Sequence, residues 1–170
     1  MNRLHSLLTR LLGIQRGFSR AVFHAFLIGT ATAITLSAIT VLVARTPIVA
    51  SSSGDLQRPY DLANEFMGSV LFAPLTETLL LGVAVYFVRK LLKSPMAVCL
   101  VIAVMAGLLH AATRPLWFFS SAAGFFVLTF MYVTWHERSY AAAFWAACLP
   151  HMLNNTVSVL ILWFLHVTEA

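Results

Sequence analysis

Four polar side chains lie inside long apolar stretches of this 170-residue chain: Glu77, His110, His151 and Asn155. A carboxylate with a neighbouring imidazole can take a proton from a trapped water molecule. A second imidazole and a carboxamide can donate hydrogen bonds to the oxyanion that forms when water attacks a carbonyl. Glu77, His110 and His151 are equally a set that could hold a divalent metal ion. The residue types therefore indicate water activation and leave open whether a metal takes part.

Glu77 stands out because it is the only charged residue in the run "VLFAPLTETLLLGVAV", residues 70–85. A charge at the centre of a membrane helix costs about 2.5–3.5 kcal/mol on insertion scales, so such a residue is expected to face the bundle interior and find a partner. The segment "LPHMLNNTV" offers partners, since His151 and Asn155 are four residues apart and share one helix face. Asn154 points to the side, where we expect a packing or backbone contact.

Two prolines accompany these polar groups. A proline inside a helix lacks the N–H that would bond the carbonyl four residues earlier. Pro74 is therefore expected to free the carbonyl of Val70 beside Glu77, and Pro150 to free that of Ala146 beside His151. The pair predicts a locally opened, hydrated pocket.

The composition places these residues in a membrane. Hydrophobic residues make up 60% of the chain, charged residues only 10%, and the mean hydropathy is +0.86; a soluble domain has about 25% charged residues. Long intervals without charge, apart from Glu77, each match the roughly 20 residues that cross a bilayer as a helix. We expect an all-α membrane bundle forming a single domain, 1–170, with five transmembrane helices. These lie near 21–44, 66–88, 95–113, 116–135 and 140–167.

The N-terminal residues 1–20 predict an amphipathic helix in the membrane interface, with apolar side chains on one face and arginines around the others. The apolar set is Leu4, Leu7, Leu8, Leu11, Ile14 and Phe18. Basic residues gather here and between later spans, which predicts a cytoplasmic N-terminus and an outside C-terminus. This asymmetry accounts for the net charge of +5, so we expect the lipid bilayer and no nucleic acid as partner. The first apolar run is too long for a typical signal-peptide core and is interpreted as an uncleaved helix.

Three further sequence features concern helix packing, a helix start and the two cysteines. Ala25, Gly29, Ala33 and Ser37 repeat every four residues, which favours close approach of a neighbouring helix. Asp61 is a candidate N-cap for the second span. Cys99 and Cys148 lie in apolar spans without a C-x-x-C pattern, and are interpreted as small buried residues.

The polar segments resemble the CAAX prenyl endopeptidase and bacteriocin-processing family (CPBP, also called Abi) of intramembrane proteases. That family has the motifs E-E-x-x-x-R, F-x-x-x-H and H-x-x-x-N on successive helices. Here "APLTETLLLG", "AGLLHAA" and "HMLNN" are similar to them, in the same order, and the resemblance covers about residues 66–160. It implies a protease of the inner membrane of a bacterium, acting on a membrane-embedded or membrane-associated peptide or protein.

The resemblance has departures. In the register set by Pro74, Glu77 matches the family's first glutamate, Thr78 replaces the second and Gly82 replaces the arginine. A register set by the glycine that often follows the arginine would make Glu77 the second glutamate instead. We prefer the first register because it keeps the glutamate that carries catalysis in the family.

Carried onto this chain, the resemblance implies a glutamate-type endopeptidase. Glu77 and His110 would activate water, and His151 and Asn155 would form the oxyanion hole. No cofactor is required by this scheme, although a divalent metal stays possible. The lost arginine and second acid motivate an alternative, an inactive membrane scaffold or bacteriocin-immunity protein. A small transporter or proton relay is a third interpretation of intramembrane Glu and His.

Overall fold

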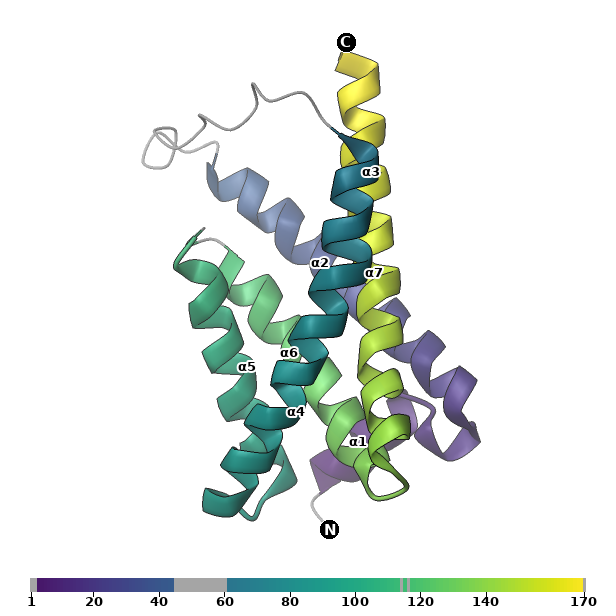
Figure 1. Cartoon of the computed structure of the whole chain (residues 1–170). Coiled ribbons are helices and arrows are strands. Elements are labelled where there is room, and N and C mark those ends of the chain that lie inside the picture. Colours follow the sequence, from purple (N-terminus) through teal and green to yellow (C-terminus); the bar gives the residue numbers. More distant parts are fainter. Residues whose placement is uncertain (1–2, 45–60, 114, 116, 170) are drawn as a thin grey trace.

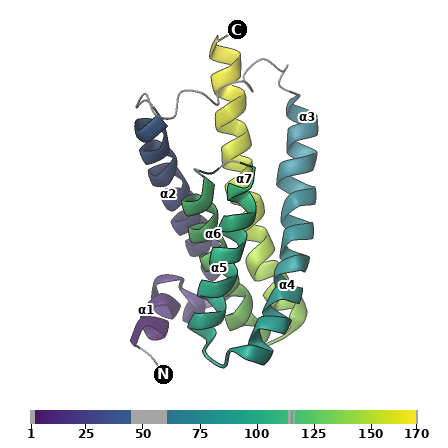
Figure 2. The same ribbon diagram turned by 90° about the vertical axis from the view of Figure 1, so that its left-hand side faces the viewer.

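The computed structural model describes residues 3–44, 61–113, 115 and 117–169. Within these ranges the chain is helical and contains no strand. The helices are α1 (Arg3–Leu11), η1 (Ile14–Arg16), α2 (Phe18–Ala44), α3 (Leu62–Glu65), η3 (Phe66–Phe72), α4 (Ala73–Leu91), α5 (Pro95–Ala111), α6 (Trp117–His136) and α7 (Tyr140–Glu169). The long helices run up and down side by side, with the N-terminus at one end of the bundle and the C-terminus at the other (Figures 1 and 2).

Elements α3, η3 and α4 form one unbroken helix, Leu62–Leu91, which corresponds to the second predicted span. It begins at Asp61, whose side chain accepts hydrogen bonds from the backbone N–H groups of Ala63 and Asn64, confirming the predicted N-cap. Its middle part, η3, is a π-helix rather than an α-helix. The helix ends where Leu92 adopts an extended conformation before the next helix starts.

Four helical segments are long and apolar enough to cross a membrane: Phe18–Leu36, Leu62–Leu91, Trp117–His136 and Tyr140–Phe164. The remaining predicted span, near 95–113, corresponds to α5, which is apolar but has only 17 residues. Its limits are set locally, because Ser94 caps its first turn and Pro95 opens it, and the chain turns after Ala111. The α5–α6 hairpin consequently stops short of the upper ends of α3 and α7 (Figures 1 and 2).

Helix α6 lies in the middle of the bundle and packs against α2, α5 and α7. Its second half is buried from Leu128 to Val133, and Met131 and Phe130 are among the most completely enclosed side chains. The outward faces of the helices instead expose large apolar residues, such as Leu79 and Leu80 on α4 and Leu109 on α5. Apolar groups on both the inside and the outside are expected of a bundle surrounded by lipid.

The N-terminal amphipathic helix is shorter than the predicted residues 1–20. It ends at Leu11, because Gly13 adopts the left-handed φ of 62° that favours glycine and turns the chain. Leu12 and Ile14 are buried in the core, whereas Leu4, Leu7 and Leu11 stay exposed. The predicted single apolar face is therefore divided between the core and the surface.

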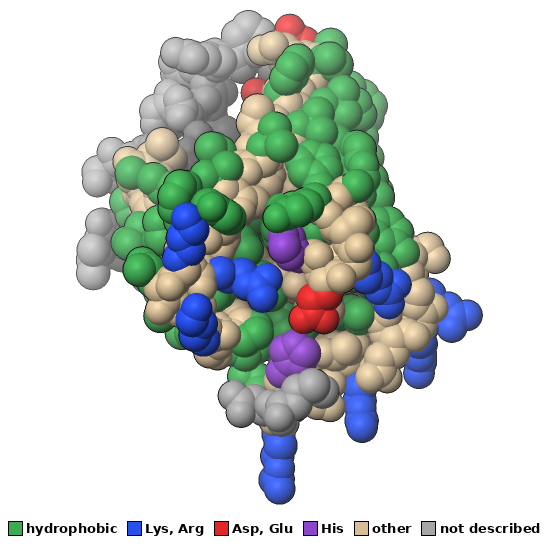
Figure 3. Space-filling view, turned by 60° about the horizontal axis from the view of Figure 1, so that its bottom comes forward, with side chains coloured by type: hydrophobic (Ala, Val, Ile, Leu, Met, Phe, Trp, Pro, Cys, Tyr) green, Lys and Arg blue, Asp and Glu red, His purple; other side chains and the backbone are tan. Residues whose placement is uncertain are grey.

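The basic residues gather at one end of the bundle, as the sequence indicated (Figure 3). The lysines and arginines that the structure describes lie on α1, η1, the start of α2, the end of α4 and the two turns at that end. They are Arg3, Arg10, Arg16, Arg20, Arg89, Lys90, Lys93 and Arg138. Arg45, Arg58 and Arg114 lie outside the described residues.

Helix α7 packs against α2, and two members of the predicted stripe of small residues, Ala25 and Gly29, lie at closely packed positions. Ala25 is buried, and a methyl group added at Gly29 would collide with the amide of Asn154. The hydroxyl of Thr30 donates a 2.7 Å hydrogen bond to the Asn154 side-chain oxygen. Asn154 thus makes the packing contact predicted for it, which leaves His151 and Asn155 on a different side of α7.

Candidate active site

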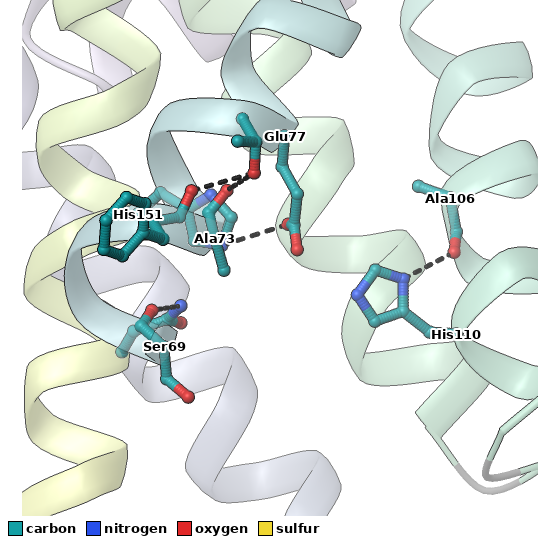
Figure 4. Close-up of polar contacts among 9 residues, drawn as sticks. Ser69, Ala73, Glu77, Ala106, His110 and His151 are labelled. Atoms are coloured by element: carbon teal, nitrogen blue, oxygen red, sulfur yellow. Dashed lines mark hydrogen bonds and ion pairs between the residues drawn. The ribbon is translucent and has the colours of Figure 1, made fainter. Parts of the chain in front are cut away.

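Glu77 on α4 and His151 on α7 face each other. The His151 Nε2 lies 3.6 Å from the Glu77 Oε2, and the side chains are 12% and 31% exposed, respectively. This separation is longer than an N–H···O hydrogen bond, so the two groups are neighbours without being locked together. Figure 4 shows the Glu77 side chain extending from α4 between His151 and His110. The acid is therefore turned toward the other polar candidates, as the cost of burying it in lipid predicts.

His110 lies next to the end of α5, and its Nδ1 is 2.8 Å from the backbone carbonyl of Ala106. Because a carbonyl oxygen only accepts, Nδ1 is the donor, and in the neutral ring Nε2 then carries the lone pair. The ring edge opposite Nδ1 is turned toward Glu77 (Figure 4). An imidazole held in this tautomer presents a base on the side of the carboxylate.

Phe125 on α6 connects the two imidazoles. Its ring centroid lies 5.5 Å from that of His110 and 5.7 Å from that of His151, with tilted and edge-on geometry. Both distances are within the range of favourable aromatic contacts. Sequence reasoning missed this residue, since one Phe among several in "AAGFFVLTF" carries no signal that distinguishes it from core packing.

His151 is enclosed by the bundle, and its Nδ1 has no hydrogen-bond partner among the residues that the structure describes. A neutral imidazole protonated at Nε2 suits this setting, because it presents a donor to the Glu77 side and leaves only an acceptor buried. His151 directly follows Pro150, which lies inside α7 without ending it.

Asn155, one turn along α7, donates from its Nδ2 to the backbone carbonyl of Ser69, with a distance of 2.7 Å. His151 and Asn155 thus both face the helix that carries Glu77, as their spacing predicted. The carbonyl that Asn155 reaches was not predicted. Pro74 was predicted to free the carbonyl of Val70, on α-helical spacing; in the π-helix η3 the Ala73 N–H bonds the Gly68 carbonyl, so residue 74 would be the donor for Ser69.

The two positions at which this chain departs from the family motif are closely packed. Thr78, which takes the place of the second acid in the register set by Pro74, is 2% exposed. Gly82, at the position of the arginine, faces the hydroxyl of Tyr132 on α6, which would lie 2.7 Å from a Cβ added there. The space beside α4 at this level is therefore filled by a tyrosine from another helix.

The three residues predicted as metal ligands do not form a metal-binding group. Among the described residues no three His, Cys, Asp or Glu side chains come close enough together to hold one ion. His110 donates from Nδ1 to the Ala106 carbonyl of its own helix, which leaves Nε2 available as a base or as a ligand. As placed here, Glu77, His110 and His151 are therefore not gathered into a set of metal ligands.

Comparison with known proteins adds one finding. A family model described as type II CAAX prenyl endopeptidase Rce1-like matches residues 59–157, which include Glu77, His110, His151 and Asn155. No curated protein and no solved structure matches the chain.

Proposed function

We propose that this protein, which belongs to the type II CAAX prenyl endopeptidase Rce1-like family, is an intramembrane endopeptidase that uses Glu77 to activate water. It is an integral membrane protein with helices suited to span the bilayer. The observation that supports the proposed mechanism best is the placement of the Glu77 carboxylate 3.6 Å from His151 in the middle of a membrane helix. An acid kept there is expected to have a use.

In the proposed reaction, water lies between the Glu77 carboxylate and the lone pair of His110 Nε2. Glu77 takes a proton as the water oxygen attacks the carbonyl carbon of the substrate, with His110 orienting the water as an acceptor. The oxyanion then accepts hydrogen bonds from His151 Nε2–H and from the second Nδ2 hydrogen of Asn155. As the carbon–nitrogen bond breaks, Glu77 returns the proton to the leaving nitrogen, giving a carboxylic acid and an amine.

Each proposed donor has a hydrogen available in this arrangement. The 3.6 Å separation leaves the His151 Nε2–H uncommitted to Glu77. A carboxamide nitrogen has two hydrogens, and only one of those on Asn155 is needed for the Ser69 carbonyl. The proposed substrate is a membrane-associated peptide or protein, because Glu77, His151 and Asn155 lie on helices long and apolar enough to cross a membrane and His110 lies on the apolar α5.

The gathering of basic residues at one end of the bundle supports an orientation in a bacterial plasma membrane. By the positive-inside bias, that end faces the cytoplasm together with the N-terminus, and the opposite end with the C-terminus faces outward. The amphipathic α1, with three exposed leucines, would then lie at the cytoplasmic surface.

The test is a cleavage assay on the purified protein in liposomes, with a library of membrane-anchored peptides analysed by mass spectrometry. Glu77→Gln keeps the shape of the side chain and removes the base, so we expect turnover to fall by about 10²–10⁴-fold. Glu65→Gln is the matched control, since Glu65 lies on the same continuous helix and its carboxylate accepts a hydrogen bond from the Ser69 hydroxyl, away from the proposed catalytic groups. Equal turnover in Glu77→Gln and the wild type would remove the proposal.

The packing at Thr78 and Gly82 favours a second candidate, an inactive relative that keeps the fold as a scaffold or immunity protein. Both positions, acidic and basic in the family motif, are closed by neutral side chains here. The same assay separates the candidates. An inactive relative would cleave no peptide in the library, and its biological activity would survive Glu77→Ala.

A further inference from the structure

The backbone carbonyl of Ser69 lacks a donor in its own helix. In η3 each N–H bonds the carbonyl five residues earlier, and the last such bond runs from Ala73 to Gly68. The next one would run from residue 74 to Ser69, but residue 74 is proline and has no N–H. The proline therefore ends the π-helix and leaves one carbonyl to be satisfied from elsewhere.

Asn155 supplies that donor from the neighbouring helix. Its Nδ2 lies 2.7 Å from the Ser69 oxygen and so takes the place of the missing N–H. Both groups are part-buried, so the bond is shielded on one side by the packed helices. The bond joins α7 to the helix of Glu77 at a point where that helix changes from π to α geometry.

We infer that Asn155, in addition to its proposed oxyanion contact, has a positioning role: its other Nδ2 hydrogen replaces the N–H absent at Pro74 and thereby holds Glu77 opposite His151. Two short sequence spacings connect this hydrogen bond to Glu77 and His151. Glu77 lies three residues after Pro74 on one helix, and His151 lies four residues before Asn155 on the other. A single cross-helix bond, four residues from His151 on α7 and eight residues before Glu77 on the other helix, fixes both the π-to-α junction and the register of α4 against α7. The link to Glu77 rests on the proposed function, whereas the bond between Asn155 and the proline-freed carbonyl does not.

This role predicts a coupling between two residues that share no hydrogen bond. In a Pro74→Ala variant, residue 74 regains an N–H, so the helix can satisfy the freed carbonyl itself. Loss of the Asn155 amide is then expected to matter much less. We therefore expect Asn155→Ala to lower the thermal midpoint in detergent by several degrees with Pro74 present, and by less than half as much in the Pro74→Ala background.

The experiment is a double-mutant cycle of wild type, Pro74→Ala, Asn155→Ala and the combined variant, measured by thermal unfolding in detergent micelles. Asn154→Ala is the control, because Asn154 bonds Thr30 on α2 and should lower the midpoint equally in both backgrounds. Asn155→Leu repeats the cycle with similar side-chain volume, in case the alanine variant does not fold. Equal losses from the Asn155 substitution with and without Pro74→Ala, or no loss in either background, would overturn the inference.

Cleavage measured on the same proteins tests the link to Glu77. A positioning role predicts that the activity lost in Asn155→Ala recovers at least tenfold when Pro74→Ala is added. An unchanged loss, in a double variant whose thermal midpoint has recovered, would show that Asn155 does not act through the position of Glu77. If the wild type cleaves no peptide, the proposed function fails, and the unfolding cycle still decides the structural part.

Discussion

The α4–α7 side of the site and the α5 side satisfy their polar groups in different ways. On the first side the contacts cross between helices, from His151 to Glu77 and from Asn155 to Ser69. On the second side His110 bonds the carbonyl of Ala106 in its own helix. The orientation of His110 is thus fixed locally, whereas that of Glu77 depends on how two helices pack. Substitutions on the two sides should therefore separate effects on chemistry from effects on stability.

The largest difference between an effect on turnover and an effect on stability is expected at His110. His110→Ala removes the proposed water-orienting base, so turnover should fall by about 10²–10³-fold. The lost bond is internal to α5, so the thermal midpoint should stay within a few degrees of the wild type. Steady-state cleavage and thermal unfolding of one preparation check both statements. His136→Ala, on α6 at the basic end, is a control expected to keep full turnover. A large fall in turnover there would show that the loss in His110→Ala is not specific to the proposed site.

Substitution of Phe125 tests the contact between the α5 side and the α4–α7 side of the site. Its ring contacts both imidazoles, so Phe125→Leu removes their common support while keeping an apolar side chain. Small misplacements of catalytic groups cost up to about 10²-fold, and we expect a loss of about 10-fold in kcat with a smaller change in KM. Phe119→Leu, at an exposed position on α6, is the matched control. Wild-type kcat in Phe125→Leu would show that the imidazoles are placed without that ring.

The smallest effect is expected on stability at Gly82. An alanine there would place its Cβ 2.7 Å from the Tyr132 hydroxyl, and overpacking of this kind costs about 1–3 kcal/mol. Combining Gly82→Ala with Tyr132→Phe removes the colliding oxygen and should recover most of the loss in thermal midpoint. Gly124→Ala, with no atom within 4 Å of its added Cβ, serves as control. A Gly82→Ala variant as stable as that control would mean that Tyr132 does not pack against α4 as described.

The features predicted correctly from the sequence are those that local residues determine. Charge-free intervals indicated the helical spans, Asp61 indicated a helix start, and the four-residue spacing placed His151 and Asn155 on one face. Family membership was also confirmed, since the matched residues 59–157 include all three motifs.

Other features depend on tertiary contacts or on small backbone choices. The carbonyl that Pro74 leaves without a donor depends on whether the preceding turns are α-helical or π-helical. Here they are π-helical, and the Ser69 carbonyl accepts its hydrogen bond from Asn155 on another helix, which no local sequence pattern predicts. Phe125 becomes part of the site only through the packing of α6 against α5 and α7. The break after Leu11 arises from the left-handed conformation of Gly13, and a glycine in a sequence permits such a conformation without requiring it.

The proposed mechanism requires Glu77 and His151 to act in the same chemical step, Glu77 on the water and His151 on the oxyanion, and a double-mutant cycle on kcat/KM is the sharpest test of it. The proteins are wild type, Glu77→Gln, His151→Ala and the combined variant, assayed on one membrane-anchored peptide. Residues that act as a unit lose activity non-additively. We predict that the combined variant is no slower than the slower single variant. If the two losses multiply, or if Glu77→Gln keeps full activity, the two residues do not act in one catalytic step.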